Sequence, residues 1–277
     1  MKILKRKNLF YLGHSFRKKG KVNYREIYLG KNIPENIETI KENFLRKCLE
    51  EDALKRCDEI KKEFKENWKK LPESVKKKEL IDLSIKFTYN TNAIEGSTIT
   101  LDETEDLIKN KISPNKNIDD VKETINHSKV FLNAINEKDI NKKIILKWHY
   151  ELFKETKKDI AGKIRDYLVK VGDYRAPDWQ DLHNLLKELF IWFNKNKNSM
   201  HTIELCARMH YKFEKIHPFG DGNGRLGRLI IANILWKNKY PILTIDYKKR
   251  KSYYKALSKD ENYFLQYFIR TYINNFK

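Results

Sequence analysis

The stretch that decides the fold lies at residues 217–228 and reads His217-Pro218-Phe219-Gly220-Asp221-Gly222-Asn223-Gly224-Arg225-Leu226-Gly227-Arg228. It is followed by a run that is apolar almost all round: Leu229, Ile230, Ile231, Ala232, Ile234, Leu235 and Trp236. A helix with apolar residues on every side is buried in the core of a protein. We therefore expect a buried helix whose N-terminus is fixed beside an imidazole, a carboxylate and two guanidiniums.

The first residues of this helix favour the binding of phosphate. A helix N-terminus leaves backbone N–H groups unpaired and carries a partial positive charge, so it attracts anions. Gly222 and Gly224 let the backbone curl around an anion, and Asn223 can add a side-chain donor. Arg225 and Arg228 share a helix face in the first turn, where cations are unfavourable unless something negative lies opposite them. The alternative, a glycine-rich turn with two solvated arginines, explains this combination less well.

Residues 222–227 also satisfy the pattern GxGxxG, and Asp246 follows at about the spacing of a ribose-binding acid in a dinucleotide-binding fold. That fold requires a buried strand before the glycines. The apolar residues before the loop instead recur at the spacing of an amphipathic helix: Cys206, Met209, Phe213 and Ile216. Helix, loop and helix do not make a βαβ unit, so the sequence argues against dinucleotide binding.

His217 and Asp221 suggest chemistry at this phosphate site. Pro218 cannot continue the preceding helix, so His217 is placed on the rim of the loop. A neutral histidine with a pKa of about 6.5 can take a proton from an attacking hydroxyl at neutral pH. Asp221 suits a phosphate-bound Mg²⁺, which needs only one or two protein carboxylates. Phe219, between them, is interpreted as a core anchor.

Residues 217–228 resemble the Fic motif, His-Pro-Phe-any-Asp/Glu-Gly-Asn-Gly-Arg-any-any-Arg, and match it at every specified position. The resemblance implies a mainly α, Fic-type helical bundle with a short β-hairpin flap. It also implies a Mg²⁺-dependent protein adenylyltransferase, which moves AMP from ATP to a hydroxyl side chain of a protein. Such a nucleotidyltransferase depends mainly on positioning and on neutralising charge.

The resemblance also implies roles for individual residues. His217 would deprotonate the target hydroxyl, with Asn223 and Arg225 completing the catalytic set, and Asp221 would hold the metal. The implied nucleotide-binding residues are Gly220, Gly222, Asn223, Gly224, Arg225, Arg228 and Tyr254. Arg228 would meet the γ-phosphate end.

Residues 91–96, Thr-Asn-Ala-Ile-Glu-Gly, resemble the inhibitory motif Ser/Thr-any-any-any-Glu-Gly/Asn, although Ser97 replaces the asparagine that is common after it. Their position ahead of the core resembles the Fic class with an N-terminal inhibitory helix. This implies an ion pair from Glu95 to Arg228 in the place that the γ-phosphate of ATP needs. In some members the same glutamate aligns a water that removes AMP, so the preferred direction of reaction stays open. The alternative for Glu95 is an ordinary carboxylate at a helix end.

Two further segments extend the resemblance. Residues 162–165 and 167–173 are rich in β-branched and aromatic residues and end in a turn signal, which predicts a hairpin. It would be the flap that adds a target segment as an extra strand, or else a plain surface hairpin. Tyr254 would stack on the nucleotide base, with Asn262 a weaker candidate, although a helical aromatic residue is equally often core. His149 and His210 are interpreted as helix-packing histidines, because neither has metal-ligand spacing.

Composition limits the compartment and the partners. The chain has 277 residues, a formal net charge of +20 and three scattered cysteines, Cys48, Cys57 and Cys206. Cysteines without a framework fit a reducing cytosol, and eighteen apolar residues never run together, so we expect a cytoplasmic protein without membrane contact. The positive charge favours acidic partners such as nucleic acid, but lysines spread along helices more simply indicate a solvated surface.

Three segments are expected. Residues 1–33 are expected to form a basic β-hairpin, because apolar or aromatic runs at 9–12 and 22–29 flank Lys18-Lys19-Gly20. Residues 34–136 are expected to form a helical region that contains the inhibitory helix. Residues 137–277 would form the Fic core. The helical pattern predicts helices over these ranges: 34–71, 75–95, 104–109, 119–136, 144–156, 182–194 and 203–216. Two short hairpins among so many helices make the chain mainly α.

Alternatives to protein adenylylation remain. One is a Fic enzyme with another nucleotide donor, and another is a nucleic-acid-binding regulator in which the Fic site senses nucleotide. The motif is unbroken, which argues against a dead scaffold. The target protein, its Ser, Thr or Tyr hydroxyl, self-modification, homodimer formation and the signal that releases Glu95 are left open by the sequence.

Overall fold

The computed structural model describes residues 1–18 and 21–276, and the chain divides into two compact units, Met1–Arg56 and Cys57–Lys277. Helix α1 (Ile37–Lys70) contributes residues to both units. Its extent confirms the long helix expected between Pro34 and Pro72. The three-segment division expected from the sequence remains a prediction.

The first unit contains a three-stranded antiparallel sheet in the order β1 (Lys2–Arg6), β2 (Leu9–Lys18) and β3 (Lys21–Gly30). Strands β2 and β3 are the predicted hairpin; residues 19–20, between them, lie outside the described part of the chain. Strand β1 was not predicted, because three of its five residues are charged. The small core of this unit joins the sheet to the first half of α1: Ile3, Leu12, Ile27, Leu29, Ile40, Phe44 and Cys48.

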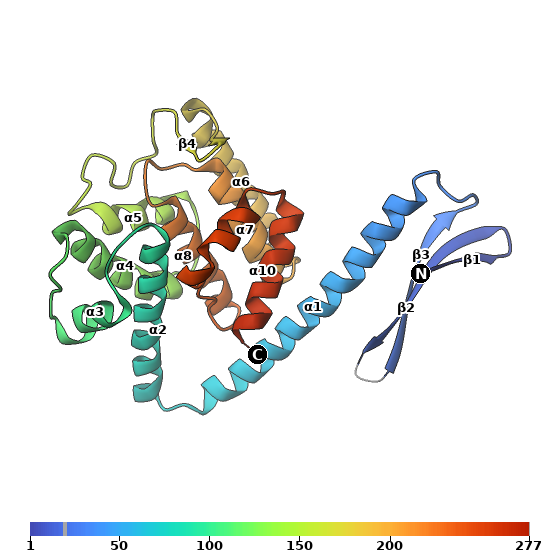
Figure 1. Cartoon of the computed structure of the whole chain (residues 1–277), viewed down its shortest axis with the longest axis horizontal. Helices are drawn as coiled ribbons and strands as arrows, with labels where there is room; N and C mark the ends of the chain where they lie inside the picture. The colour runs from blue at the N-terminus through green and yellow to red at the C-terminus, as the bar shows by residue number, and fades with distance from the viewer. Residues whose placement is uncertain (19–20, 277) are drawn as a thin grey trace. The chain divides into compact units, whose positions relative to one another are not determined.

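The second unit is built around α8 (Asn223–Lys237), which is buried along most of its length (Figure 1). It packs against α2 (Glu73–Ile94), α4 (Ile118–Asn136), α5 (Lys142–Phe153) and α7 (Thr202–Ile216). This confirms the prediction from its unbroken apolar run. Because the helix is held on several sides, its N-terminus is a fixed point.

The other helices complete a mainly α unit, as predicted. They are α3 (Leu101–Glu105) with a π-helical turn at Asp106–Asn110, α6 (Leu182–Asn196), α9 (Arg250–Leu257), α10 (Glu261–Asn275) and short 3₁₀ helices at Trp179–Asp181 and Tyr247–Lys249. Thr100 and Glu103 form a capping box at the start of α3, and Asn117 and Asn141 cap α4 and α5. Side-chain caps at these positions stabilise helix starts, so local signals and tertiary packing agree.

The sequence reading missed α10 and misplaced the flap hairpin. Helix α10 is capped by Asp260 and buries an apolar stripe: Phe264, Leu265, Phe268, Ile269 and Tyr272. The expected hairpin at 162–173 is wrong in its extent, because its strands are β4 (Lys170–Val171) and β5 (Tyr174–Arg175). Gly172, which we took to end the hairpin, has φ 58° and lies in its turn. Residues 162–165 form no strand because Arg165 is engaged elsewhere.

Aromatic residues near the end of α1 belong to the second unit and pack within it. The rings of Phe64 and Trp68 stack with centroids 5.7 Å apart, and Trp236 of α8 packs edge-on against Trp68 at 5.1 Å. Tyr240 donates a hydrogen bond to Asp58. The apolar stripe of α1 therefore serves two cores, one in each unit. Within the described residues, no helix is long and apolar enough to cross a membrane.

Asn233 ties α8 to the end of α4, and its removal should destabilise the fold. Its buried Nδ2 donates to the carbonyl oxygens of Ala134 at 2.7 Å and Glu137 at 2.9 Å. Asn233→Leu should lower the free energy of unfolding by about 1–3 kcal/mol, because buried carbonyls lose their donors. In the control variant Asn196→Leu, the amide that is lost donates only to the Trp192 carbonyl in the same helix, on a partly exposed face. The free energy of unfolding should therefore change by no more than about 0.5 kcal/mol. Urea unfolding measures both; equal losses would contradict the prediction.

Candidate functional site

The loop at residues 217–222 connects α7 to α8, so the predicted helix–loop–helix is confirmed and the strand of a dinucleotide fold is absent at this place. His217 ends α7 in the left-handed conformation, at φ 49° and ψ 60°. Gly222, at φ 80°, precedes α8, and a Cβ there would lie 2.6 Å from the Phe153 ring. The loop therefore turns sharply at both ends. Asp246, the residue considered for ribose, caps a 3₁₀ helix instead.

Asn223 and Phe219 hold the loop together from inside. The Asn223 side chain donates to the Phe219 carbonyl at 2.8 Å and accepts from the Phe219 N–H at 3.0 Å. Phe219 is fully buried, which confirms its interpretation as a core anchor. Both ends of the Asn223 amide are thus engaged. In this structure Asn223 shapes the loop, and the second N–H of its amide is what could still donate to phosphate.

His149 of α5 supports the same loop. Its Nδ1 accepts from the Gly162 N–H at 2.8 Å, so its Nε2 carries the proton and donates to the Asp221 carbonyl at 3.1 Å. The ring lies on Phe219 with centroids 4.0 Å apart. Burial lowers the pKa of His149 to about 4. The packing role expected for His149 is present, together with two hydrogen bonds that the sequence did not reveal.

The His217 imidazole is arranged as an acceptor. Its Nδ1 lies 3.3 Å from the Glu214 carbonyl oxygen, which assigns the proton to Nδ1 and leaves Nε2 with a free lone pair. Burial lowers the pKa of His217 below its usual value, so the ring is neutral at pH 7. The Glu214 carboxyl beneath it is buried, which raises its pKa to about 8. Glu95 and Asp221 favour the charged form of His217, but desolvation outweighs them.

Arg165, which we had placed in a flap strand, is a buried clamp. Its Nε donates to the His217 carbonyl at 2.9 Å, and its two terminal nitrogens donate to the carbonyls of Tyr167 at 2.6 Å and Pro177 at 2.7 Å. Its own N–H bonds the Pro218 carbonyl at 3.0 Å. One side chain thus fixes the strained backbone at His217 to both ends of the flap segment.

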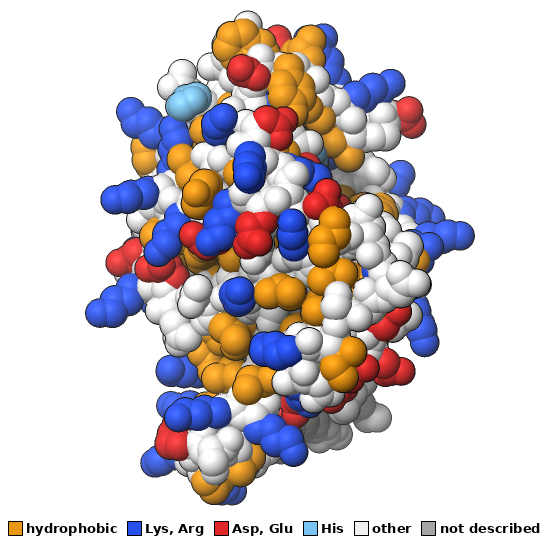
Figure 2. Space-filling view, turned by 90° about the vertical axis from the view of Figure 1, so that its left-hand side faces the viewer, with side chains coloured by type: hydrophobic (Ala, Val, Ile, Leu, Met, Phe, Trp, Pro, Cys, Tyr) orange, Lys and Arg blue, Asp and Glu red, His pale blue; other side chains and the backbone are white. Residues whose placement is uncertain are grey.

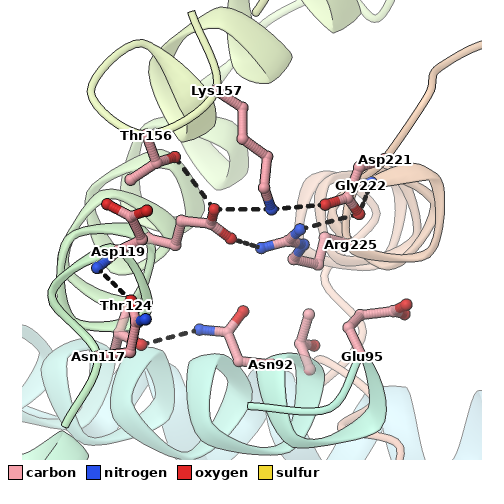
Figure 3. A network of polar contacts seen from close by, with 12 residues as sticks. Asn92, Glu95, Asn117, Asp119, Thr124, Thr156, Lys157, Asp221, Gly222 and Arg225 are labelled. Carbon is pink, nitrogen blue, oxygen red and sulfur yellow. Dashed lines mark hydrogen bonds and ion pairs between the residues drawn. The ribbon is translucent and has the colours of Figure 1, made fainter. Parts of the chain in front are cut away.

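Asp221 belongs to a polar network with residues from α4, from α8 and from the turn that follows α5 (Figure 3). Its Oδ1 accepts from Arg225 at 3.1 Å, and its Oδ2 from the Lys157 ammonium at 2.7 Å. Lys157 also lies 3.0 Å from Glu123 of α4, and Arg225 forms a second ion pair with Glu123. Thr156 donates to the same carboxylate at 3.0 Å. Two carboxylates and two cations therefore neutralise one another.

The charged groups of this network shift one another's pKa values. Desolvation alone would raise the pKa of Asp221, but Arg225 and Lys157 outweigh it and lower it to about 2. The pKa of Glu123 is lowered in the same way, since the two cations overcome its desolvation. Conversely, hydrogen bonds to Asp221 and Glu123 raise the pKa of Lys157 despite its burial. All four groups are charged at neutral pH.

Arg228 faces a different carboxylate. Its Nη2 lies 2.5 Å from Oε1 of Glu95, so the ion pair implied by the inhibitory motif is present in the structure. The guanidinium also donates to the Thr91 carbonyl at 3.3 Å and to the Tyr253 hydroxyl at 3.4 Å. A Cβ on Gly224 would lie 2.2 Å from Glu95 Oε1. Glycine at this position therefore lets the carboxylate reach the start of α8.

A cavity of about 150 Å³ opens between these two ion-pair systems, and its walls include Asn92, Glu95, Glu123, Lys157, Asp221 and Arg225. Two buried polar atoms in these walls, Nε of Arg225 and Oδ1 of Asn92, find no hydrogen-bond partner within residues 1–18 and 21–276. A buried donor without a partner is costly. The cavity therefore offers space and an unused donor beside the start of α8.

The residues proposed for the nucleotide base lie at the border of this region. Tyr254 of α9 is 45 % exposed, and its hydroxyl donates to the Ile94 carbonyl at 3.1 Å. One face of the phenol is thus available while its hydroxyl contacts the Glu95 turn. Asn262 is exposed and its N–H bonds the cap of α10. His210, fully buried, bonds the Tyr253 hydroxyl at 2.7 Å, as a packing histidine does.

Glu123, Lys157 and Arg165 were missed by the sequence analysis. Glu123 lies in a polar, buried part of α4 with Thr124, Asn126, His127 and Ser128. Adjacent polar residues in a helix that must pack could have indicated a buried network. Lys157 lies in a lysine-rich segment and has no distinguishing signal. Only the contacts with Asp221 and Glu123 separate it from its neighbours.

Residues 139–235 match the model of the Fic/DOC family. The chain therefore contains a Fic domain. It is 33% identical over 175 residues to a protein adenylyltransferase Fic of Drosophila ananassae, covering 61% of this chain and 35% of that protein. It is 32% identical over 190 residues to a protein adenylyltransferase Fic of Nematostella vectensis, covering 66% and 44%. The chain thus spans less than half the length of these curated relatives.

The solved structure of Fic-1 (residues 134–508) from C. elegans has the same fold, with a TM-score of 0.75 at 24% identity over 88% of this chain and 76% of that one. The Fic-type helical bundle predicted from the motif is therefore confirmed. This likeness concerns the fold, including segments outside residues 139–235.

Protonation of His149 should destabilise the Fic unit in mild acid. Because the folded pKa of about 4 lies below the unfolded value of about 6.5, stability is complete above pH 6.5 and falls as the pH drops toward 4. From pH 7 to 5 this histidine should contribute a loss of about 2 kcal/mol. His149→Gln should shrink the pH 7-to-5 difference in unfolding free energy by that amount, as urea titrations at both pH values can measure. The control variant His183→Gln changes an exposed histidine and should keep the wild-type difference in unfolding free energy between pH 7 and 5. If His149→Gln also keeps this difference, the assignment of the acid sensitivity to His149 is refuted.

Proposed function

We propose that this chain is a protein adenylyltransferase that transfers AMP from ATP to a hydroxyl side chain of a protein target. The observation that carries the proposal is the complete loop at 217–228, with a neutral His217 acceptor beside the start of α8. The curated relatives named protein adenylyltransferase support it. The target, self-modification and homodimer formation belong to the same proposal.

In this proposal His217 Nε2 takes the proton of the attacking hydroxyl, since Nδ1 is held by the Glu214 carbonyl. The backbone at Gly222 and Gly224, the α8 N-terminus and Arg225 bind the phosphates. Gly220 borders the same loop, and Tyr254 stacks on the base. Arg165 acts indirectly by fixing the backbone of His217. An exposed flap, β4 and β5, receives the target segment by strand addition.

The residues around Asp221 fit a Mg²⁺ ion bound together with a nucleotide. Asp221 Oδ2 already bonds a cationic group, the Lys157 ammonium, 2.7 Å away. The described residues contain no cluster of three or more metal-ligating side chains. That fits Mg²⁺, which keeps waters and is held by one or two carboxylates plus substrate phosphates. When bound, the ion would neutralise phosphate charge; Asp221 would hold it and Glu123 would keep Arg225 oriented.

Glu95 restrains the site in this proposal. Its carboxylate neutralises Arg228, the guanidinium that the γ-phosphate end would otherwise meet. Like charges exclude each other from one position, so Glu95 and the phosphate compete for Arg228. The same carboxylate faces the cavity beside Asp221, where it could orient a water for removal of AMP. Both directions of reaction use the same cradle.

Labelling with ATP that carries ³²P at the α-phosphate tests the proposal. Glu95→Gly should increase label in protein at least tenfold over wild type, because Arg228 is freed for phosphate. His217→Ala in that background should abolish labelling yet keep nucleotide binding, since the base is lost and the cradle remains. His183→Ala, at an exposed histidine, is the matched control and should label normally.

No label in protein from Glu95→Gly, with candidate targets, cell extract or itself as acceptor, would refute AMP transfer. Competition by unlabelled GTP, CTP or UTP separates ATP from another nucleotide donor. Mass spectrometry of the labelled product would identify the modified Ser, Thr or Tyr.

Lys157 should compete with the metal for Asp221. In Lys157→Met the ammonium is gone, so Mn²⁺, used as a spectroscopic substitute for Mg²⁺, should bind at least tenfold more tightly in the absence of nucleotide. Lys154→Met is the matched control. Lys154 forms its ion pair with Glu151 rather than with Asp221, so its loss should leave Mn²⁺ affinity unchanged. Electron paramagnetic resonance counts free Mn²⁺ directly. Equal affinities of Lys157→Met and wild type would contradict this competition, and Asp221→Asn should abolish Mn²⁺ binding in both backgrounds.

A further inference from the structure

The positive charge of the first unit is concentrated in its sheet segment. Residues 1–33, which contain the sheet, have ten lysines and arginines and one glutamate. Residues 34–56, which contain the first half of α1, have five basic and six acidic residues. Nearly half of the net charge of +20 is therefore in the sheet segment. Such a local excess points to an anionic partner rather than to solubility alone.

The sheet has one covered and one open face. Ile3, Leu12 and Ile27 are cross-strand partners on the face that packs on α1. The neighbouring row, Leu4, Tyr11 and Tyr28, points to the opposite face, because successive residues alternate along a strand. Arg25 is used internally, since it pairs with Glu51 of α1 at 2.5 Å. The open face is therefore lined by aromatic rings within a basic segment.

Tyr24 lies flat on this open face. A Cβ on Gly13 of β2 would come within 2.3 Å of the Tyr24 hydroxyl and 2.9 Å of its ring. Only a residue without a side chain leaves room for the ring at this place, and Tyr24 is nonetheless 49% exposed. A ring with one face on the sheet and the other in solvent is a platform for stacking. Tyr28, 57% exposed, provides a second ring.

The single acidic residue of the sheet segment is already neutralised. Glu26 forms two hydrogen bonds of 2.8 Å with Arg6 and accepts another from the Tyr24 hydroxyl at 2.9 Å. Tyr11 lies beside Tyr28, with centroids 5.4 Å apart, and the Arg6 guanidinium lies 5.2 Å from the Tyr11 ring. Glu26 therefore orients the ring and the guanidinium, and repels a phosphate less than a free carboxylate would.

The Fic unit offers a contrast. On the face over α3, α4 and α5, lysine and arginine side chains are interspersed with acidic and apolar ones (Figure 2). This agrees with the interpretation of a solvated lysine-rich surface for that part of the chain. The sheet segment differs in its charge density, because residues 1–33 carry a net charge of +9 whereas residues 57–277 carry +12 over 221 residues.

We propose that the open face of the sheet binds single-stranded nucleic acid. Stacking of unpaired bases on Tyr24 and Tyr28 supplies a sequence-tolerant contact, and the surrounding lysines and arginines bind the phosphate backbone. Duplex is the weaker ligand, because its bases are already stacked and cannot reach the rings. The site is separate from the proposed adenylyltransferase centre and does not depend on it.

Fluorescence anisotropy of the full chain with a labelled mixed-sequence 20-nucleotide RNA, the same DNA strand and its duplex tests this. Both single strands should bind at 50 mM salt and more tightly than the duplex, with affinity falling roughly tenfold or more by 200 mM. Lys2→Glu/Lys7→Glu should weaken binding at least tenfold and flatten the salt dependence. The matched double reversal on exposed α2 residues, Lys77→Glu/Lys78→Glu, should change it less than twofold.

The ring contribution is tested at Tyr24. Tyr24→Thr keeps a strand-forming residue but removes the ring, and should weaken binding roughly fivefold or more, whereas Tyr24→Phe should retain it. Retention by Tyr24→Phe together with unchanged thermal unfolding shows that loss in Tyr24→Thr comes from the ring. Absence of binding at 50 mM salt, tighter binding of duplex, or equal weakening by the sheet and α2 reversals would each overturn the proposal. None of these outcomes bears on AMP transfer.

Discussion

Two guanidiniums, those of Arg225 and Arg228, are buried at the start of α8, where the helix dipole makes a positive charge least favourable. A buried charge without a partner costs several kcal/mol or more, so the fold must supply carboxylates. Arg225 receives Asp221 from its own loop and Glu123 from α4, while Arg228 receives Glu95 from the end of α2. Helices far apart in sequence are thus brought to one helix start by electrostatic need as well as apolar packing.

Two side chains of the network occupy positions that the proposed function assigns to a metal cation and to a phosphate. The Lys157 ammonium lies on Asp221, where the proposed function needs a metal cation, and the Glu95 carboxylate lies on Arg228, where it needs a phosphate. Both charges of a metal–nucleotide complex therefore have an internal counterpart. Binding of such a complex would replace two ion pairs by two others of the same sign, so little net charge is buried anew. This exchange explains how a site with two buried arginines is stable before it binds anything.

Sequence alone predicted the parts of this site that are contiguous. Residues 217–228 predicted the loop and the buried helix, because they form a local pattern. The ion pair between Glu95 and Arg228, 133 positions apart, was predicted only because residues 91–96 resemble the inhibitory Fic motif. Glu123, Lys157 and Arg165 were not predicted because their roles depend on contacts across 102, 64 and 52 positions of the chain, respectively. The flap was misplaced because β-branched residues near Arg165 resemble a strand, whereas the buried guanidinium binds three carbonyls instead. β-Strand propensity pointed to the right part of the chain for the flap, but tertiary hydrogen bonds determined its conformation.

The restraint proposed for Glu95 is confined to the end of one helix. Glu95 caps α2, and Gly96 follows at φ 100°, so the chain turns away immediately after the carboxylate. The turn is held by the Tyr254 hydroxyl on the Ile94 carbonyl and by Arg228 on the Thr91 carbonyl. Since the cavity of about 150 Å³ lies beside Glu95, its side chain can rotate off Arg228 without displacing α2, most of whose second half is buried. In the proposed function, release would therefore need one side-chain rotation and a replacement anion for Arg228, and a base stacked on Tyr254 would contact the residue that holds this turn.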